Sequence, residues 1–261
     1  MHSFFCLLLA FLSFLCKAQD FSAYEKHYFN ATELNLPYRL LRPIHQEAEK
    51  KYPLLIFLHG AFERGFDNER QLDIGGRFFL RDSIRTNYAS YVLFPQCPEA
   101  DVWAFFEASA DPASGKTTGI RFPFPKKPTD VSSALKELID SLVHTDSIDP
   151  KRIYIAGLSQ GGMGVLDFLA RYPELFAAGL SICGAGNVTT VRNFSGKSAP
   201  WLFHGEDDDV IPVSFSRTYF KKLRKLSADV RYSEYPGVKH NSWVNAFNEP
   251  DFLHWLFSKN K

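Results

Sequence analysis

The 261-residue sequence has almost no excess of charge of either sign. Thirty Lys and Arg residues face 29 Asp and Glu residues, which gives a formal net charge of +1. Partners such as nucleic acid or an anionic membrane surface attract proteins with a positive excess, so this balance argues against both. The sequence also lacks charge blocks and internal repeats. With 45% hydrophobic residues, the length suits one domain with a large core.

Long hydrophobic runs are absent except at the N-terminus. The apolar run within residues 1–16 is too short to span a bilayer. It ends at Cys16 and Ala18, small residues at the −3 and −1 positions of a cleavage site. We therefore expect a signal peptide at 1–18 and a mature domain at 19–261, secreted or periplasmic and without stable membrane insertion after cleavage. A signal peptide usually begins with a basic segment, but here His2 is the only basic side chain before the apolar run. An uncleaved anchor is therefore the alternative.

Cysteine is scarce, and removal of residues 1–18 leaves only Cys97 and Cys183. An oxidising compartment would allow them to form a disulfide. Each follows a predicted strand, however, and these two strands are not expected to be neighbours in the sheet. We therefore expect two unpaired and partly buried thiols.

Strands and helices are predicted to alternate along the chain. Apolar runs that predict buried strands lie at 54–58, 91–94, 153–156, 177–183 and 201–203, and edge strands are expected at 36–43 and 230–235. Helices are expected at 76–86, 128–145, 162–172, 213–226 and 250–258. Residues 20–35 show no regular pattern. The alternation predicts a single α/β domain with a mostly parallel, twisted sheet and helices on both faces.

One long segment, at about 100–127, has no regular period. It contains Trp103, Phe105 and Phe106 together with a patch rich in Ser and Gly. A long aromatic segment inside a compact domain is usually functional, so we expect a loop over the site. The alternative is a disordered surface insert, against which the aromatic content argues.

The sequence Gly-Leu-Ser-Gln-Gly at 157–161 follows a predicted strand and precedes a helical pattern. This arrangement is typical of a nucleophile elbow, a tight turn that exposes a serine hydroxyl at the carboxyl end of a strand. It makes Ser159 the candidate nucleophile and the N–H of Gln160 a candidate oxyanion donor. The glycines on either side would keep side chains out of the space where strand and helix almost touch. The motif is too short to decide the matter alone.

A serine nucleophile needs a histidine base and a carboxylate that orients it. Both are found in loops after later predicted strands, at 204–212 and 239–243. The order Ser, Asp, His is that of the α/β-hydrolase superfamily, which the chain resembles. Members commonly read His-Gly-x-x-Asp-x-x-x-Pro in the first of these loops. That pattern selects Asp208 as the acid, with Asp207 and Asp209 as alternatives, and the position after the last strand selects His240 as the base.

Four stretches, at 53–65, 92–103, 154–164 and 234–243, resemble the esterase/peptidase-like branch of the superfamily. This branch includes dienelactone hydrolases, carboxylesterase-phospholipases and the catalytic domain of prolyl oligopeptidases. The resemblance implies that the N–H of Ala61 is the second oxyanion donor, beside that of Gln160. The chain departs from the family pattern at Phe62, where relatives commonly have glycine. This phenylalanine is expected to narrow the substrate pocket. A dienelactone hydrolase would have cysteine in place of Ser159.

These features predict a secreted serine hydrolase that cleaves carboxylic esters through an acyl-enzyme, without a metal or another cofactor. Its substrate would be a small-molecule or carbohydrate-linked ester. We expect Trp103 to line the substrate pocket, as an aromatic wall for feruloyl or acetyl-xylan-like esters. The alternative is that Trp103 only anchors its own loop.

Two other functions stay open. A serine peptidase of the prolyl-oligopeptidase-like type would use the same catalytic residues. A binding protein on an inactive hydrolase scaffold would belong to a different class, but the presence of all three candidate triad residues and both oxyanion loops argues against it.

Overall fold

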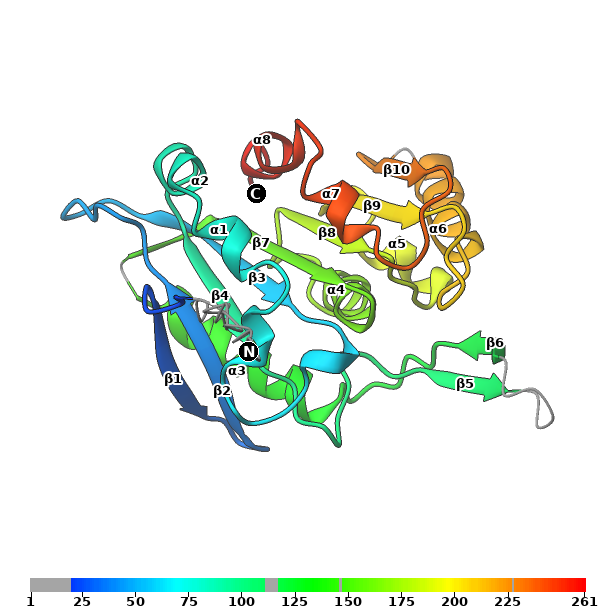
Figure 1. Ribbon diagram of the computed structural model, residues 1–261, viewed down its shortest axis with the longest axis horizontal. Helices are drawn as coiled ribbons and strands as arrows, with labels where there is room; N and C mark the ends of the chain where they lie inside the picture. Colours follow the sequence, from blue (N-terminus) through cyan, green and yellow to red (C-terminus); the bar gives the residue numbers. More distant parts are fainter. Residues whose placement is uncertain (1–19, 111–116, 146, 227) are drawn as a thin grey trace, which may run out of the picture.

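The computed structural model describes residues 20–110, 117–145, 147–226 and 228–261. An eight-stranded sheet lies at the centre, in the order β1-β2-β4-β3-β7-β8-β9-β10 (Figure 1). Every neighbouring pair from β4 to β10 is parallel, whereas β1 and β2 join that edge in antiparallel pairs. The predicted α/β domain with a mostly parallel sheet is therefore confirmed.

The strands of the main sheet are β1 (Tyr24–Asn30), β2 (Asn35–Leu41), β3 (Tyr52–Leu58), β4 (Tyr91–Pro95), β7 (Ile148–Leu158), β8 (Ala178–Ile182), β9 (Ala199–Gly205) and β10 (Arg231–Tyr235). The helices are α1 (Gly76–Phe79), α2 (Asp82–Asn87), α3 (Asp130–Val143), α4 (Gln160–Arg171), α5 (Val191–Phe194), α6 (Ser214–Lys225), α7 (Trp243–Ala246) and α8 (Phe252–Phe257).

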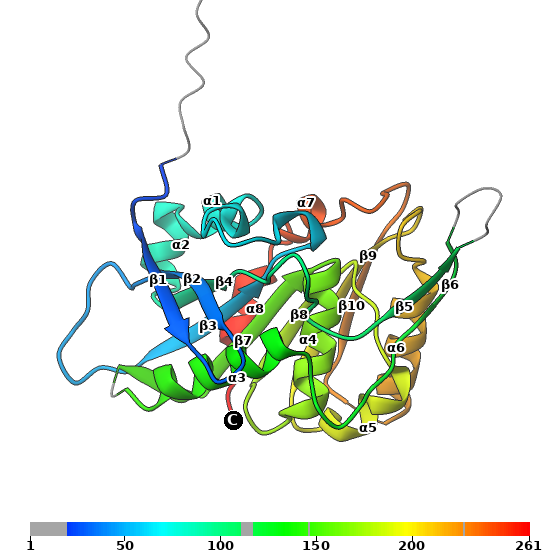
Figure 2. The ribbon, with the colours of Figure 1, turned by 90° about the horizontal axis from the view of Figure 1, so that it is seen from below.

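The core has two layers because successive side chains of a strand point to opposite faces of the sheet. In β3, Leu54 and Ile56 pack with α3, α4 and α6 on one face. Leu55 and Phe57 pack with α1, α7 and α8 on the other face. Figure 2 shows α3 to α6 below the sheet and α1 and α7 above it. All residues of β3 are buried, as the continuous apolar run predicted.

The expectation that residues 20–35 are irregular is wrong. They contain β1, which pairs with β2 from Tyr24 opposite Leu41 to Asn30 opposite Asn35. The outer strand of this edge is therefore β1 and not β2. Its pattern was missed because the partly buried positions include Glu25 and His27, which bond to each other at 3.0 Å instead of packing as apolar side chains.

Two other predicted segments also differ. The helix expected at 76–86 is divided into α1 and α2, because Arg81 between them adopts extended backbone angles. The segment 100–127 is not irregular throughout. It contains an antiparallel hairpin of β5 (Glu107–Ala110) and β6 (Thr117–Arg121), which projects away from the main sheet in Figure 1.

Cys97 and Cys183 are both free and buried. Cys97 follows β4 and Cys183 follows β8, and β3 and β7 lie between those two strands. The prediction of two unpaired thiols is confirmed for the reason given. Within the described residues, no helix has the length and apolar character needed to cross a membrane. The predicted signal peptide, 1–18, lies outside those residues.

Candidate active site

Ser159 forms the turn between β7 and α4. Its backbone has φ 52° and ψ −118°, in a region that residues other than glycine rarely adopt. The flanking glycines are required by close approach of backbone. A methyl group added at Gly161 would overlap the carbonyl oxygen of Leu58, and one added at Gly157 would lie 2.6 Å from the carbonyl carbon of Gly161. The strained turn predicted from the motif is confirmed.

Three side chains from separate loops meet at this edge of the sheet. His240 Nε2 lies 3.0 Å from the Oγ of Ser159. On the other side of the ring, Nδ1 lies 2.8 Å and 3.1 Å from the two carboxylate oxygens of Asp208. Because an ionised carboxylate only accepts hydrogen bonds, Nδ1 carries the proton and Nε2 is free to accept from the serine hydroxyl.

Asp208 is immobilised by several donors. The N–H groups of Val210 and Ile211 donate to its Oδ1 at 2.9 Å and 2.8 Å. His204 Nε2 lies 3.2 Å from its Oδ2. Burial opposes ionisation of the carboxyl group, but the hydrogen bonds from His204, His240 and the backbone of Ile211 outweigh it and hold the pKa of Asp208 below its ordinary value. Asp208 is therefore an anion at neutral pH.

The alternative acids lie elsewhere. Asp207 and Asp209 are exposed, and Asp209 faces Lys239 at 3.3 Å. The histidines at the ends of β3 and β9, His59 and His204, brace loops by hydrogen bonding. His59 accepts the N–H of Cys97 at Nε2, at 2.9 Å, and its burial lowers its pKa to about 4. Among the histidines that the structure describes, His240 is thus the one placed between a carboxylate and Ser159.

Two backbone N–H groups are available beside the serine. Gln160 is the first residue of α4, so its N–H has no partner within the helix. Ala61 begins a short 3₁₀ turn, Ala61–Glu63, directly after Gly60. A methyl group added at Gly60 would lie 3.8 Å from the Cβ of Ser159, which brings this loop against the nucleophile turn. The arrangement fits the two donors expected at Ala61 and Gln160.

Trp103 does not line a pocket. Its side chain is fully buried, and its indole N–H donates to the carbonyl oxygen of His59 at 3.1 Å. A methyl group added at Gly164 would lie 2.6 Å from the Cβ of Trp103, so the side chain is pressed against the backbone of α4. The predicted substrate-binding role is therefore wrong for this conformation, and the alternative of an anchoring role is the one that the contacts support.

An apolar wall lies beside Ser159, Asp208 and His240, on the side of the segment 100–127, which we call the insert. Ala104, Met163, Ala185 and Ile211 form a buried cluster. Met163 lies one helical turn after Ser159, and Ile211 lies three residues after Asp208. Beyond Met163, a cavity runs between α4 and the insert and is also lined by Phe105, Phe122 and Phe124. The insert therefore contributes apolar side chains other than Trp103 near the site.

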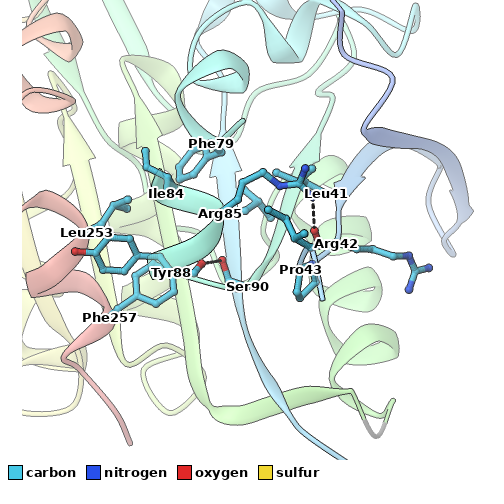
Figure 3. A pocket seen from close by; sticks show the side chains of 12 residues that line it. Leu41, Arg42, Pro43, Phe79, Ile84, Arg85, Tyr88, Ser90, Leu253 and Phe257 are labelled. Carbon is cyan, nitrogen blue, oxygen red and sulfur yellow. Dashed lines mark hydrogen bonds between the residues drawn. The ribbon is translucent and has the colours of Figure 1, made fainter. Parts of the chain in front are cut away.

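A separate pocket, shown in Figure 3, lies between β2, β4, α2 and α8. Its lining includes Leu41, which ends β2, and Ser90, which precedes β4. Since β2 runs antiparallel to β4, both residues lie at the amino ends of the parallel strands. The pocket is therefore at the opposite end of the sheet from Ser159.

Comparison with protein families gives one match that covers most of the chain. Residues 42–253 match the model of the phospholipase/carboxylesterase family of α/β-hydrolases. The chain belongs to this family. It is accordingly a hydrolase of the carboxylesterase type.

Similar proteins include plant carboxylesterases. A "probable carboxylesterase SOBER1-like" of Arabidopsis thaliana is 26% identical over 202 residues, which are 72% of each chain. Carboxylesterase SOBER1 of the same plant is 24% identical over 207 residues, 72% of this chain and 82% of the relative. These identities are low, but they extend over the greater part of both relatives.

Among solved structures, a thermostable esterase is 33% identical with a TM-score of 0.81. It aligns with 92% of this chain, which spans only 64% of that esterase's length. An acylaminoacyl peptidase of Pyrococcus horikoshii is 16% identical with a TM-score of 0.61, covering 90% of this chain and 42% of its own. A ferulic acid esterase is 14% identical with a TM-score of 0.64. The alignment covers 90% of this chain and 97% of that esterase. The last two share the fold only.

Sequence reasoning missed the position of Cys183. Its backbone has φ 40°, and its sulfur lies within 4.8 Å of ligand atoms of Asp208 and His240. Burial raises the pKa of this thiol to about 12, so at neutral pH it is protonated. A signal was present, since Cys183 follows a predicted strand at the same sheet edge as Ser159. The order of the strands was needed to bring them together.

Proposed function

We propose that the protein is a serine carboxylesterase that hydrolyses its substrate through an acyl-enzyme intermediate. The observation that carries this proposal is the hydrogen-bonded series from Ser159 through His240 to Asp208, at 3.0 Å and 2.8 Å. Each member projects from a loop that follows a different strand, β7, β10 and β9. Such a series is the arrangement that activates a serine hydroxyl.

In the first half-reaction, the Oγ of Ser159 attacks the carbonyl carbon of the ester as His240 Nε2 takes the hydroxyl proton. The carbonyl oxygen becomes negative and accepts hydrogen bonds from the N–H groups of Ala61 and Gln160. The bond to the alcohol oxygen then breaks, and His240 returns the proton to the departing alcohol. Each oxyanion donor is worth about 3 kcal/mol of transition-state stabilisation in known enzymes.

In the second half-reaction, water replaces the alcohol. His240 takes a proton from the water as its oxygen attacks the acyl-enzyme, and Ser159 leaves with that proton to restore the free enzyme. Asp208 remains an anion throughout. It stabilises the transient imidazolium and holds His240 in the tautomer with Nδ1 protonated.

The substrate that the site supports best is an ester with an apolar acyl or aryl part. The support is the wall of Ala104, Met163 and Ile211 beside the triad, against which Phe122 packs. A carbohydrate-linked or feruloyl ester has less support, because it was inferred from Trp103, which is buried.

The decisive test is replacement of the nucleophile. We expect Ser159→Ala to abolish labelling by a fluorophosphonate probe and to lower kcat by about five to six orders of magnitude. Labelling that persists in this variant would show that another residue is the nucleophile. A panel of acyl-nitrophenyl esters and aminoacyl-nitroanilides with the wild-type enzyme would separate an esterase from a peptidase, because the same residues can cleave both bonds.

We also propose that residues 1–18 direct export, on the basis of the apolar run and the small residues before Gln19. Sequencing the N-terminus of protein recovered outside the producing cell would test this. A mature chain that begins at Gln19 is expected, and a chain that retains residues 1–18 would support the anchor instead.

A further inference from the structure

Two polar side chains behind the candidate acid have no step of their own in the mechanism described above. His204 lies near the end of β9 and is fully buried, and Ser216, in the first turn of α6, is only 4% exposed. The Oγ of Ser216 lies 2.8 Å from Nδ1 of His204. A polar pair buried this deeply is costly unless its donors and acceptors are satisfied, so the direction of each hydrogen bond can be worked out.

The partners of His204 fix which ring nitrogen carries the proton. Nε2 lies 2.8 Å from the carbonyl oxygen of Ile211 and 3.2 Å from Oδ2 of Asp208. A carbonyl oxygen and an ionised carboxylate only accept hydrogen bonds, so Nε2 is the donor. Nδ1 is then the acceptor, and the hydroxyl of Ser216 donates to it. Ser216 thereby holds His204 in the tautomer whose N–H faces Asp208.

Two imidazole rings approach the same oxygen of Asp208. His240 Nδ1 lies 2.8 Å from Oδ2, and His204 Nε2 lies 3.2 Å from it. The His204 N–H is shared with the carbonyl oxygen of Ile211, whose own N–H donates to Oδ1 at 2.8 Å. His204 therefore holds the carboxylate both directly and through Ile211. It also offsets part of the negative charge that would otherwise face His240.

We propose that His204 and Ser216 are positioning residues for the reaction, which continue the series of Ser159, His240 and Asp208 on the far side of the acid. This inference rests on the proposed function, because both residues act through the candidate acid and base. His204 keeps Oδ2 aligned with His240 and limits the charge that this oxygen presents to the ring. The imidazolium of His240 is thereby stabilised less than it would be by Asp208 alone.

Two other titratable groups near these histidines are accounted for. Glu234 of β10 stands beside His204 in the parallel register, but its carboxylate accepts from Nε of Arg217 at 2.9 Å. The thiol of Cys183 lies within 4.8 Å of a ring nitrogen of His240 and is protonated at neutral pH, because burial raises its pKa to about 12. Neither group therefore replaces the candidate acid as the charge that stabilises the imidazolium.

The experiment uses a matched pair of variants in the full chain. A glutamine amide can place its nitrogen where His204 has Nε2, whereas the shorter asparagine amide reaches only the place of Nδ1. His204→Gln therefore keeps a donor beside Asp208, and His204→Asn loses it. The pH dependence of kcat is measured on a soluble nitrophenyl ester. We expect the acid limb to move to higher pH by about half a unit or more in His204→Asn and to stay near that of the wild type in His204→Gln.

Two variants in α6 test the role of Ser216. Ser216→Ala should move the acid limb in the same direction but by less, because the His204 ring keeps its contacts at Nε2. Ser214→Ala is the matched control, an exposed serine in the same turn, and should behave as the wild type. An unchanged acid limb in His204→Asn, or an equal shift in His204→Asn and His204→Gln, would overturn the proposal and leave these side chains a role in stability alone.

A second measurement needs neither activity nor a variant that folds. Nitrogen NMR of the imidazole rings in the wild type should show His204 protonated at Nε2, and a ring protonated at Nδ1 would overturn the proposal. The titration of His240, followed in the same spectra, should shift in His204→Asn by the same amount as the acid limb. If Ser159→Ala keeps its activity while this titration shifts, the positioning role stands and the serine mechanism fails.

Discussion

The turn around Ser159 and the hairpin of the insert lie on the same side of the domain but are held in opposite ways. A methyl group added at Gly157, Gly161, Gly162 or Gly164 would approach another atom to less than 3 Å. At Gly119 in β6 the same addition meets no atom within 4 Å. The turn around Ser159 is therefore fixed by close packing at its glycines, whereas Gly119 in the hairpin has open space around it.

The insert is attached through its two stems. On one side, Trp103 reaches the loop after β3. On the other, the guanidinium of Arg171 lies 4.2 Å over the ring of Phe124 and donates to the carbonyl oxygen of Pro125 at 2.9 Å. Both anchors connect to α4, which begins at the nucleophile turn. This difference in packing indicates that the fold holds the catalytic turn in one geometry, whereas substitutions in the hairpin should disturb the fold less.

The largest effect in this comparison is expected at Asp208. Asp208→Asn should lower kcat about 10⁴-fold, because the amide stabilises the wrong tautomer of His240. Asp207→Asn and Asp209→Asn are the matched controls and should leave kcat nearly unchanged, since both side chains are exposed. Steady-state kinetics on one nitrophenyl ester would decide. A larger loss at Asp207 than at Asp208 would contradict the assignment.

A pair of glycine variants tests the packing difference directly. Gly161→Ala should cost more than about 4 kcal/mol or prevent folding, because the added methyl group would overlap the carbonyl oxygens of Leu58 and His59. Gly119→Ala should change the free energy of unfolding by less than about 0.5 kcal/mol. Urea unfolding measures both. Similar costs at the two positions would show that the hairpin is packed as tightly as the turn.

Much of the site could be predicted because a parallel sheet gathers the carboxyl ends of its strands at one edge. Serine, aspartate and histidine in loops after three different predicted strands were enough to predict that Ser159, Asp208 and His240 meet. The identity of the acid needed the resemblance to a family, since three neighbouring aspartates share that loop. Sequence pattern alone did not separate the buried carboxylate from its exposed neighbours.

Other features could not be read from the sequence, for physical reasons. The hairpin strands are short and polar and pair only with each other, so they carry no apolar signal. Trp103 is a large apolar residue, which suits a buried anchor and an exposed wall equally well. The place of Cys183 beside His240 depends on the order β7-β8-β9-β10, a long-range property that local patterns do not contain.

The next prediction concerns the stability of the protein in acid, which depends on the buried His59 before the oxyanion loop. The pKa of His59 is lowered from 6.5 to about 4 in the folded protein, because burial disfavours the imidazolium. Above pH 6.5 both folded and unfolded states are neutral at this residue. As the pH falls, the unfolded state binds the proton first, so about 3 kcal/mol of stability is lost between pH 6.5 and 4.

His59→Gln provides the comparison, because a glutamine amide can still accept from the N–H of Cys97 and does not titrate. Urea unfolding at several pH values between 7.5 and 4 should show a steeper loss for the wild type than for this variant. Parallel pH profiles in the two proteins would show that His59 does not carry the acid sensitivity.

The smallest effect is expected at Trp103, where the two regions are joined. Trp103→Phe keeps an aromatic side chain against Gly164 but removes the donor to the carbonyl oxygen of His59. Leaving that buried oxygen unpaired should cost about 1–2 kcal/mol, or a Tm lowered by roughly 2–8 °C. If Trp103 is an anchor, the variant should change kcat/KM for aryl and for acetyl esters by the same factor. A loss confined to aryl esters, with an unchanged Tm, would return Trp103 to the substrate pocket and would require the insert to adopt a different conformation during catalysis.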